Sequence, residues 1–222
     1  MKTRGLEQLV EEGRHALERG KLGTSIQRFN AALKLDRRSV DAHFHLGLAK
    51  LKGGGINEAR FHARKVLKIN PYEPNARLNL GVIEAALGKE FLAIRNYNRE
   101  LKRYPQCYEA HFNLGLIYTR RRRWKCALKH LLECWKHSHP GKLRDEYLAL
   151  AAQHTRDIAL EERIYLQRLA ENPQDLWALN NLGVVRNKQG RHNEARCLFQ
   201  RELEINPADR IAKKNLKYTP ST

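Results

Sequence analysis

An internal repeat of 34 residues constrains the fold of this chain more than any other feature of its sequence. Segments 40–73, 74–107 and 108–141 align without gaps, and each carries a Leu-Gly pair at the same offset. Extending the frame in both directions adds 6–39, 142–175 and 176–209, which leaves only residues 1–5 and 210–222 outside the six frames. A period of this size indicates that one small structural unit is stacked on copies of itself.

Recurring residues divide each frame into two helices. The eighth position is glycine in five frames, and a residue this small lets two helices approach closely. The fifteenth position is glycine in four frames, with Arg122 and Arg156 in the other two, and glycine readily takes the left-handed conformation that ends a helix. Proline at position 32 of four frames ends a second helix. The pattern therefore predicts a helix, a turn and a second helix in every frame.

Composition narrows the class of protein. Hydrophobic residues are 41% of the chain and charged residues 30%, which is too apolar for a disordered basic tail and typical of a solvated helical protein. No apolar run approaches the roughly 18 to 20 residues of a membrane span, and the first residues lack the apolar segment of a signal peptide. We therefore expect a cytoplasmic protein, either free or peripheral to a membrane or an assembly.

The 34-residue pattern resembles the tetratricopeptide repeat (TPR) family, whose consensus has the same length and the same Leu-Gly, Ala, aromatic and Pro positions. This sequence departs from the consensus at Arg122 and Arg156, and frame 142–175 has Glu161 and Arg168 at small-residue positions. The resemblance implies an all-α, right-handed superhelical solenoid of antiparallel helix pairs. Residues 1–5 would be an extension, 6–209 six repeats, and 210–222 a short capping helix with a basic tail.

The resemblance also implies that the first helix of each repeat lines a concave groove. Frame positions 2, 5, 9 and 12 form a stripe on that helix, opposite the face committed to the core. Many of these positions are apolar, and an apolar surface exposed to water usually marks an interaction site. The predicted groove residues on this stripe and at the neighbouring position 6 are Phe44, His45, Leu48, Leu78, Asn79, Val82, Phe112, Asn113, Leu116, Trp177, Asn181 and Val184.

Asparagine recurs at position 6, at Asn79, Asn113 and Asn181. An amide offers a donor and an acceptor, and in TPR arrays Asn at this position hydrogen-bonds the backbone of a bound peptide. The alternative is a solvated consensus residue. We predict a non-enzymatic scaffold or adaptor, without a cofactor, that binds a protein ligand, as a peptide or a partner helix, in the groove during complex assembly. Self-association is a variant, because open helical arrays stack end to end or accept a neighbour's terminus.

The net charge of +18 suggests a second class of function. Charges at the groove positions nearly cancel, so the positive charge lies on other surfaces, and its densest cluster is Arg120, Arg121, Arg122, Arg123 and Lys125. Such a basic outer face would attract nucleic acid or an acidic membrane surface by counterion release. The alternative is a solvated face that keeps the chain soluble, and Trp124 is the only aromatic residue beside the arginine run.

Two smaller features allow a chemical and a structural interpretation. Cys126, His130 and Cys134 recur at i, i+4 and i+8 of one predicted helix, where they would offer soft ligands to zinc or copper. Alternatively, Cys134 fills a small-residue position and the imidazole faces solvent.

Arg186 and Glu202 lie at frame positions that are normally apolar or small, so we expect them to form a buried ion pair. The sequence shows no catalytic constellation in a predicted cleft.

Overall fold

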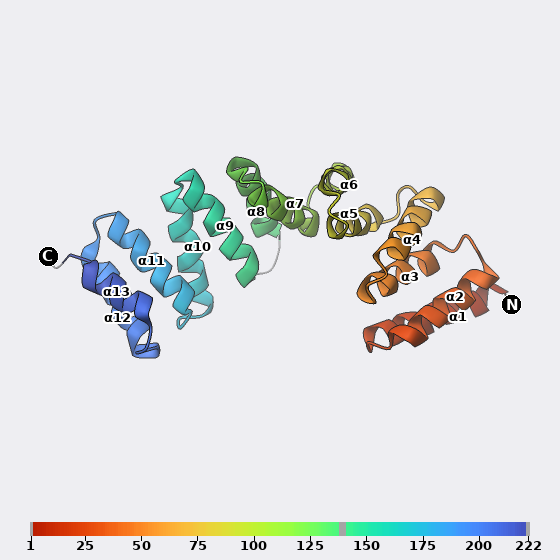
Figure 1. The fold of residues 1–222 in the computed structure, drawn as a ribbon, viewed down its shortest axis with the longest axis horizontal. Coiled ribbons are helices and arrows are strands. Elements are labelled where there is room, and N and C mark those ends of the chain that lie inside the picture. The colour runs from red at the N-terminus through yellow and green to blue at the C-terminus, as the bar shows by residue number, and fades with distance from the viewer. Residues whose placement is uncertain (1, 138–140, 221–222) are drawn as a thin grey trace. The chain divides into compact units, whose positions relative to one another are not determined.

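The computed structural model describes residues 2–137 and 141–220, and every regular element in them is an α-helix (Figure 1). The predicted all-α array of helix pairs is confirmed. Each helix in the described ranges is too short or too polar to cross a bilayer. The helices are α1 (Lys2–Glu18), α2 (Leu22–Leu35), α3 (Val40–Lys52), α4 (Ile56–Ile69), α5 (Ala76–Ala86), α6 (Glu90–Arg103), α7 (Tyr108–Arg120), α8 (Trp124–His137), α9 (Lys142–Thr155), α10 (Ile158–Glu171), α11 (Leu176–Lys188), α12 (His192–Ile205) and α13 (Arg210–Tyr218).

The chain forms two compact units, Met1–Ile117 and Tyr118–Thr222. In the N-terminal unit α1 packs on α2, α3 on α4 and α5 on α6, and the pairs are joined by contacts of α2 with α3 and of α4 with α5. In the C-terminal unit each helix from α8 to α12 packs on the next one, and α13 packs on α12. Successive helices therefore bury their apolar faces against sequence neighbours, as the short repeat requires.

The turn inside each frame has the same backbone conformation whether glycine or arginine occupies it. Arg122 and Arg156 have φ values of 54° and 60°, in the left-handed region that the four glycines at this position also occupy. The amide of the next residue closes the turn in each case, as in the Asp157 N–H that donates to the Ala152 carbonyl oxygen at 2.9 Å. The predicted helix ends are confirmed, and two of them use an unfavourable residue.

In three frames, close helix approach depends on glycine at position 8, because an aromatic ring at position 24 packs against it. A Cβ atom on Gly81 would lie 2.5 Å from the ring of Tyr97, and the Gly13–Phe29 and Gly183–Phe199 pairs have the same 2.5 Å approach. Frame 40–73 differs, because its position 24 is Ala63. A Cβ atom on Gly47 would meet its nearest neighbour at 3.5 Å, which is an ordinary contact.

The predicted ion pair between Arg186 and Glu202 is wrong. The Arg186 guanidinium instead donates to Glu162 at 2.5 Å and lies 3.3 Å from a carboxylate oxygen of Glu194. Position 11 lies at the junction between repeats, so its side chain reaches α10 of the preceding repeat. Glu202 is 3% exposed, and burial together with the charge of Asp209 raises its pKa to about 7.

Candidate functional site

A small crevice opens on the predicted groove face of the N-terminal unit. Its volume is about 10 Å³, and Phe44 and Leu48 of α3 form one side of it while Asn79 of α5 lies on the other. The remaining lining residues are small or aliphatic and come from α3, α4 and α5: Gly47, Ala63, Val66, Ala76 and Ile83. The crevice exists because Ala63 leaves open the space above Gly47 that an aromatic ring fills in other frames.

The three asparagines of the predicted ladder differ in their hydrogen bonding. In the part of the chain that the structure describes, the half-buried side-chain amides of Asn79 and Asn113 make no hydrogen bond. The Nδ2 atom of Asn181 donates to the Trp177 carbonyl oxygen of its own helix at 2.7 Å. Two of the three amides therefore keep their donors and acceptors available for a ligand.

Most of the other predicted groove residues are half-buried, as an apolar wall open on one side would be. Leu78 is the exception at 8% exposure, because α5 packs against both α3 and α4. It therefore contributes less open surface than predicted. His45 stacks on Phe29 with ring centroids 5.8 Å apart, and burial, followed by the charge of Arg14, lowers its pKa. A ligand role for the half-buried members stays a prediction: His45, Val82, Phe112, Leu116, Trp177 and Val184.

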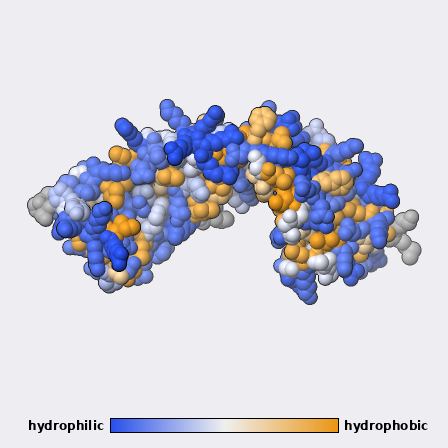
Figure 2. Space-filling model, viewed as in Figure 1, coloured by the Kyte–Doolittle hydropathy of each residue, from blue (hydrophilic) through white to orange (hydrophobic). Residues whose placement is uncertain are grey.

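The predicted basic patch is exposed at every member: Arg120, Arg121, Arg122, Arg123 and Lys125. Trp124, which follows the arginine run in the sequence, stacks on His154 with ring centroids 3.8 Å apart and an interplanar angle of 7°. One face of that indole is therefore already covered. Figure 2 shows a mostly hydrophilic surface, with hydrophobic residues gathered over the α3–α6 part of the N-terminal unit.

The possible metal stripe on α8 does not form a cluster. Cys126 is exposed, Cys134 is buried, and His130 stacks on Tyr118 with centroids 5.6 Å apart. Eight residues rotate about 80° around a helix of 3.6 residues per turn, so the two thiols face different surroundings. Within the described residues, no group of three or more His, Cys, Asp or Glu side chains could hold a metal ion.

Sequence reasoning missed the role of Ala63, although the sequence carries a signal for it. Position 24 is aromatic in four frames, so the small residue in frame 40–73 marks a gap opposite Gly47. It also missed the grouping of Tyr72 and Arg77 with the last turn of α6, which line one pocket. These residues come from a loop and two helices, and no repeat position relates them.

Two segments of the chain match models of a known repeat family. A family model described as TPR repeat matches residues 13–54, and one described as tetratricopeptide repeat matches 92–133. The structure of PilF from Pseudomonas aeruginosa matches with a TM-score of 0.75 over 96% of this chain and 97% of that chain, at 15% identity. The chain carries tetratricopeptide repeats.

Curated relatives of this TPR protein are much longer than the chain itself. It is 27% identical over 194 residues to the tetratricopeptide repeat-containing protein trd-1 of Caenorhabditis elegans, a match that covers 84% of the chain and 23% of trd-1. It is 23% identical over 175 residues to the human protein O-mannosyl-transferase TMTC1, covering 77% of the chain and 20% of TMTC1. The TPR chain thus spans about a fifth of the length of these relatives.

Proposed function

We propose that this TPR protein is a non-enzymatic scaffold that binds an extended peptide or a partner helix across its first helices, for complex assembly. The TPR fold supports a protein-interaction scaffold in general. The observation that carries the specific proposal is the crevice at Phe44, Leu48 and Asn79, which combines apolar walls with an amide that makes no hydrogen bond inside the described chain.

The crevice suits one small apolar side chain of a ligand. A volume of about 10 Å³ holds a single methyl-sized group. Burying one group of that size contributes roughly 0.8 kcal/mol before the costs of association. The Asn79 amide, beside it, supplies one donor and one acceptor to the ligand backbone. An aliphatic residue in an extended segment is therefore the anchor that we propose.

The transferase name of TMTC1 does not change this proposal. The match covers 77% of this chain but only 20% of TMTC1. We propose that the repeats of this chain act as a binding module and contribute no catalytic residue.

Filling the crevice tests the proposal. The variant Ala63→Val adds two methyl groups at the crevice wall, close to the small volume that the crevice offers. Peptides are first selected on the wild-type chain from a random 12-residue display library. We expect their affinity to fall at least tenfold for Ala63→Val and for Leu48→Ala combined with Asn79→Ala. A matched pair on the exposed surface of α6, Phe91→Ala with Asn98→Ala, should stay within twofold. Equal affinity for all four proteins would refute the proposal.

A further inference from the structure

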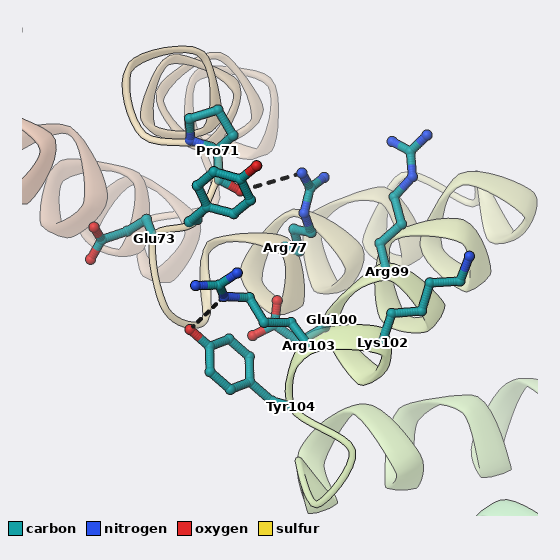
Figure 3. A pocket seen from close by; sticks show the side chains of 9 residues that line it. Pro71, Glu73, Arg77, Arg99, Glu100, Lys102, Arg103 and Tyr104 are labelled. Atoms are coloured by element: carbon teal, nitrogen blue, oxygen red, sulfur yellow. Dashed lines mark hydrogen bonds between the residues drawn. The ribbon is translucent and has the colours of Figure 1, made fainter.

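The N-terminal unit carries a second, larger pocket between the loop that follows α4 and the C-terminal end of α6 (Figure 3). Its volume is about 610 Å³, which is within the range of small-molecule sites. It shares no residue with the crevice. Its cationic and aromatic lining residues are Tyr72, Arg77, Arg99, Lys102, Arg103 and Tyr104.

The side chains that line this basic pocket carry a net positive charge, although two of them are carboxylates. Glu100 is 2% exposed, and its Oε1 atom accepts the Asn75 backbone N–H at 3.2 Å. Glu73 accepts a hydrogen bond from the Asn70 side chain at 2.9 Å and points away from the cations in Figure 3. Arg99 and Lys102 are exposed and extend from α6 toward open solvent. An anion that enters therefore meets cations first.

Two of the cations are held in place by the chain. Arg77 donates to the Pro71 carbonyl oxygen at 3.3 Å, and the Nε atom of Arg103 donates to the Tyr104 hydroxyl at 3.3 Å (Figure 3). The Arg103 guanidinium also lies over the ring of Tyr72, 4.7 Å from its centroid. Tyr72 nevertheless keeps 65% of its surface exposed. The cation–π contact with Arg103 thus holds the Tyr72 ring in place while much of the ring stays exposed.

One face of α4, the helix that precedes the loop of this pocket, has the same character. Phe61, Lys65 and Lys68 are spaced at i, i+4 and i+7, so they share one side of the helix. Phe61 is 54% exposed, Lys65 lies 5.3 Å from its ring centroid, and the three residues line a further pocket of about 390 Å³. Lys68 is three residues from Pro71. An exposed aromatic ring with a cation beside it therefore occurs both on this face of α4 and in the basic pocket.

We propose that the basic pocket and this face of α4 bind single-stranded nucleic acid. Arg77, Arg99 and Lys102 neutralise backbone phosphates, while a base stacks on the open face of Tyr72. Positively charged grooves with exposed aromatic side chains are what sequence-tolerant single-strand binders use, because every base has a π-face. An acidic peptide would satisfy the cations but would leave the aromatic faces without a planar partner, and a vesicle surface would not need a recessed pocket.

The test measures fluorescence anisotropy of a labelled 12-nucleotide oligouridylate, with oligothymidylate in parallel, over a series of salt concentrations. Arg99→Ala with Lys102→Ala should weaken binding at least tenfold and reduce the salt slope by about 1.4, for two lost phosphate contacts. The matched control removes the same charge from α13, with Lys213→Ala and Lys214→Ala, and should change affinity less than threefold. Equal losses for both variants would show a general charge effect and overturn the proposal.

Variants of Tyr72 distinguish the binding of nucleic acid from the binding of other polyanions. Tyr72→Ala should weaken oligonucleotide binding about 5- to 150-fold, the cost of one lost base stack, at an unchanged salt slope, and Tyr72→Phe should bind as the wild type. Polyglutamate, a phosphoserine peptide and vesicles containing phosphatidylserine serve as rival probes. Tighter binding of any of them than of the oligonucleotide, or no effect of Tyr72→Ala, would overturn the proposal. Circular dichroism melts establish that each variant is folded.

Discussion

The Nε atom of Arg60 donates to Oε1 of Glu84 at 2.8 Å, across the junction between α4 and α5 and 24 residues along the chain. Glu162 and Arg186 make the equivalent contact between α10 and α11, at the same separation and with the charges exchanged. Frame position 21 of one repeat thus pairs with position 11 of the next in both units. The two frame positions that form the ion pair are therefore the same in both units, whereas the position that carries the cation differs.

Removing the cations from this junction should destabilise the N-terminal unit strongly. Glu84 is almost fully buried and contacts Arg60 and Arg64, so Arg60→Ala with Arg64→Ala leaves a buried charge without a partner. We expect a loss of about 3 to 5 kcal/mol in the free energy of unfolding, measured by urea denaturation. Adding Glu84→Leu should recover most of it. A triple variant no more stable than the double variant would contradict this account.

Alanine should have opposite effects at two glycines of the same frame position. Gly81→Ala forces the new Cβ against the Tyr97 ring, and we expect it to lower the free energy of unfolding by about 1 to 3 kcal/mol. Gly47→Ala meets ordinary contacts opposite Ala63, so the gain in helix propensity should leave it neutral or up to about 1 kcal/mol more stable. Thermal melts compare the two variants. Similar losses at both positions would show that ring proximity is not the cause.

Glycine at the left-handed turn of frame 142–175 should stabilise the C-terminal unit. Arg156 has a φ of 60°, which costs a residue with a Cβ atom about 1 to 2 kcal/mol. Arg156→Gly should therefore raise the free energy of unfolding by about 1 kcal/mol, after the entropy that glycine loses on folding. Gln153→Gly, an exposed helical position in α9, is the control and should lower it by about the same amount. A loss at both positions would argue against strain at Arg156.

The carboxyl group of Glu202 should make stability depend on pH. Burial, and then Asp209, raises its pKa from 4.5 to about 7, so the folded chain binds a proton between these values that the unfolded chain releases. Its contribution to stability is therefore greatest below pH 4.5 and is lost as pH rises through 7. Glu202→Gln should be more stable than the wild type by roughly 1 to 3 kcal/mol at pH 8, and the difference should shrink toward pH 5.

The exposed Glu204 on the same helix provides the control for this pH dependence. Glu204→Gln should follow the wild type from pH 5 to pH 8 in urea denaturation. A constant difference between wild type and Glu202→Gln over this range would show that Glu202 ionises normally in the folded chain.

The 34-residue pattern alone is enough to predict the all-α class, the division into helix pairs and the places where helices end. These features depend on the spacing of residues within a frame of about 34 residues. Helix formation and helix ends are set by such local spacing, through backbone hydrogen bonds and the periodicity of apolar side chains. Even Arg122 and Arg156 take the left-handed turn, because the helices on either side impose it. The half-buried character of Phe44 and Leu48 follows from the same periodicity.

Which side chains meet between neighbouring helices could not be predicted from the repeat pattern. Arg186 reaches Glu162 of the preceding repeat, Leu78 is covered where α5 meets α3 and α4, and the crevice opens because Ala63 is small. Tyr72 and Arg103, far apart in the repeat frame, meet in the basic pocket. A repeat period specifies which side of a helix is apolar, but the partner of each side chain depends on shape and charge across a junction, where every repeat carries different residues.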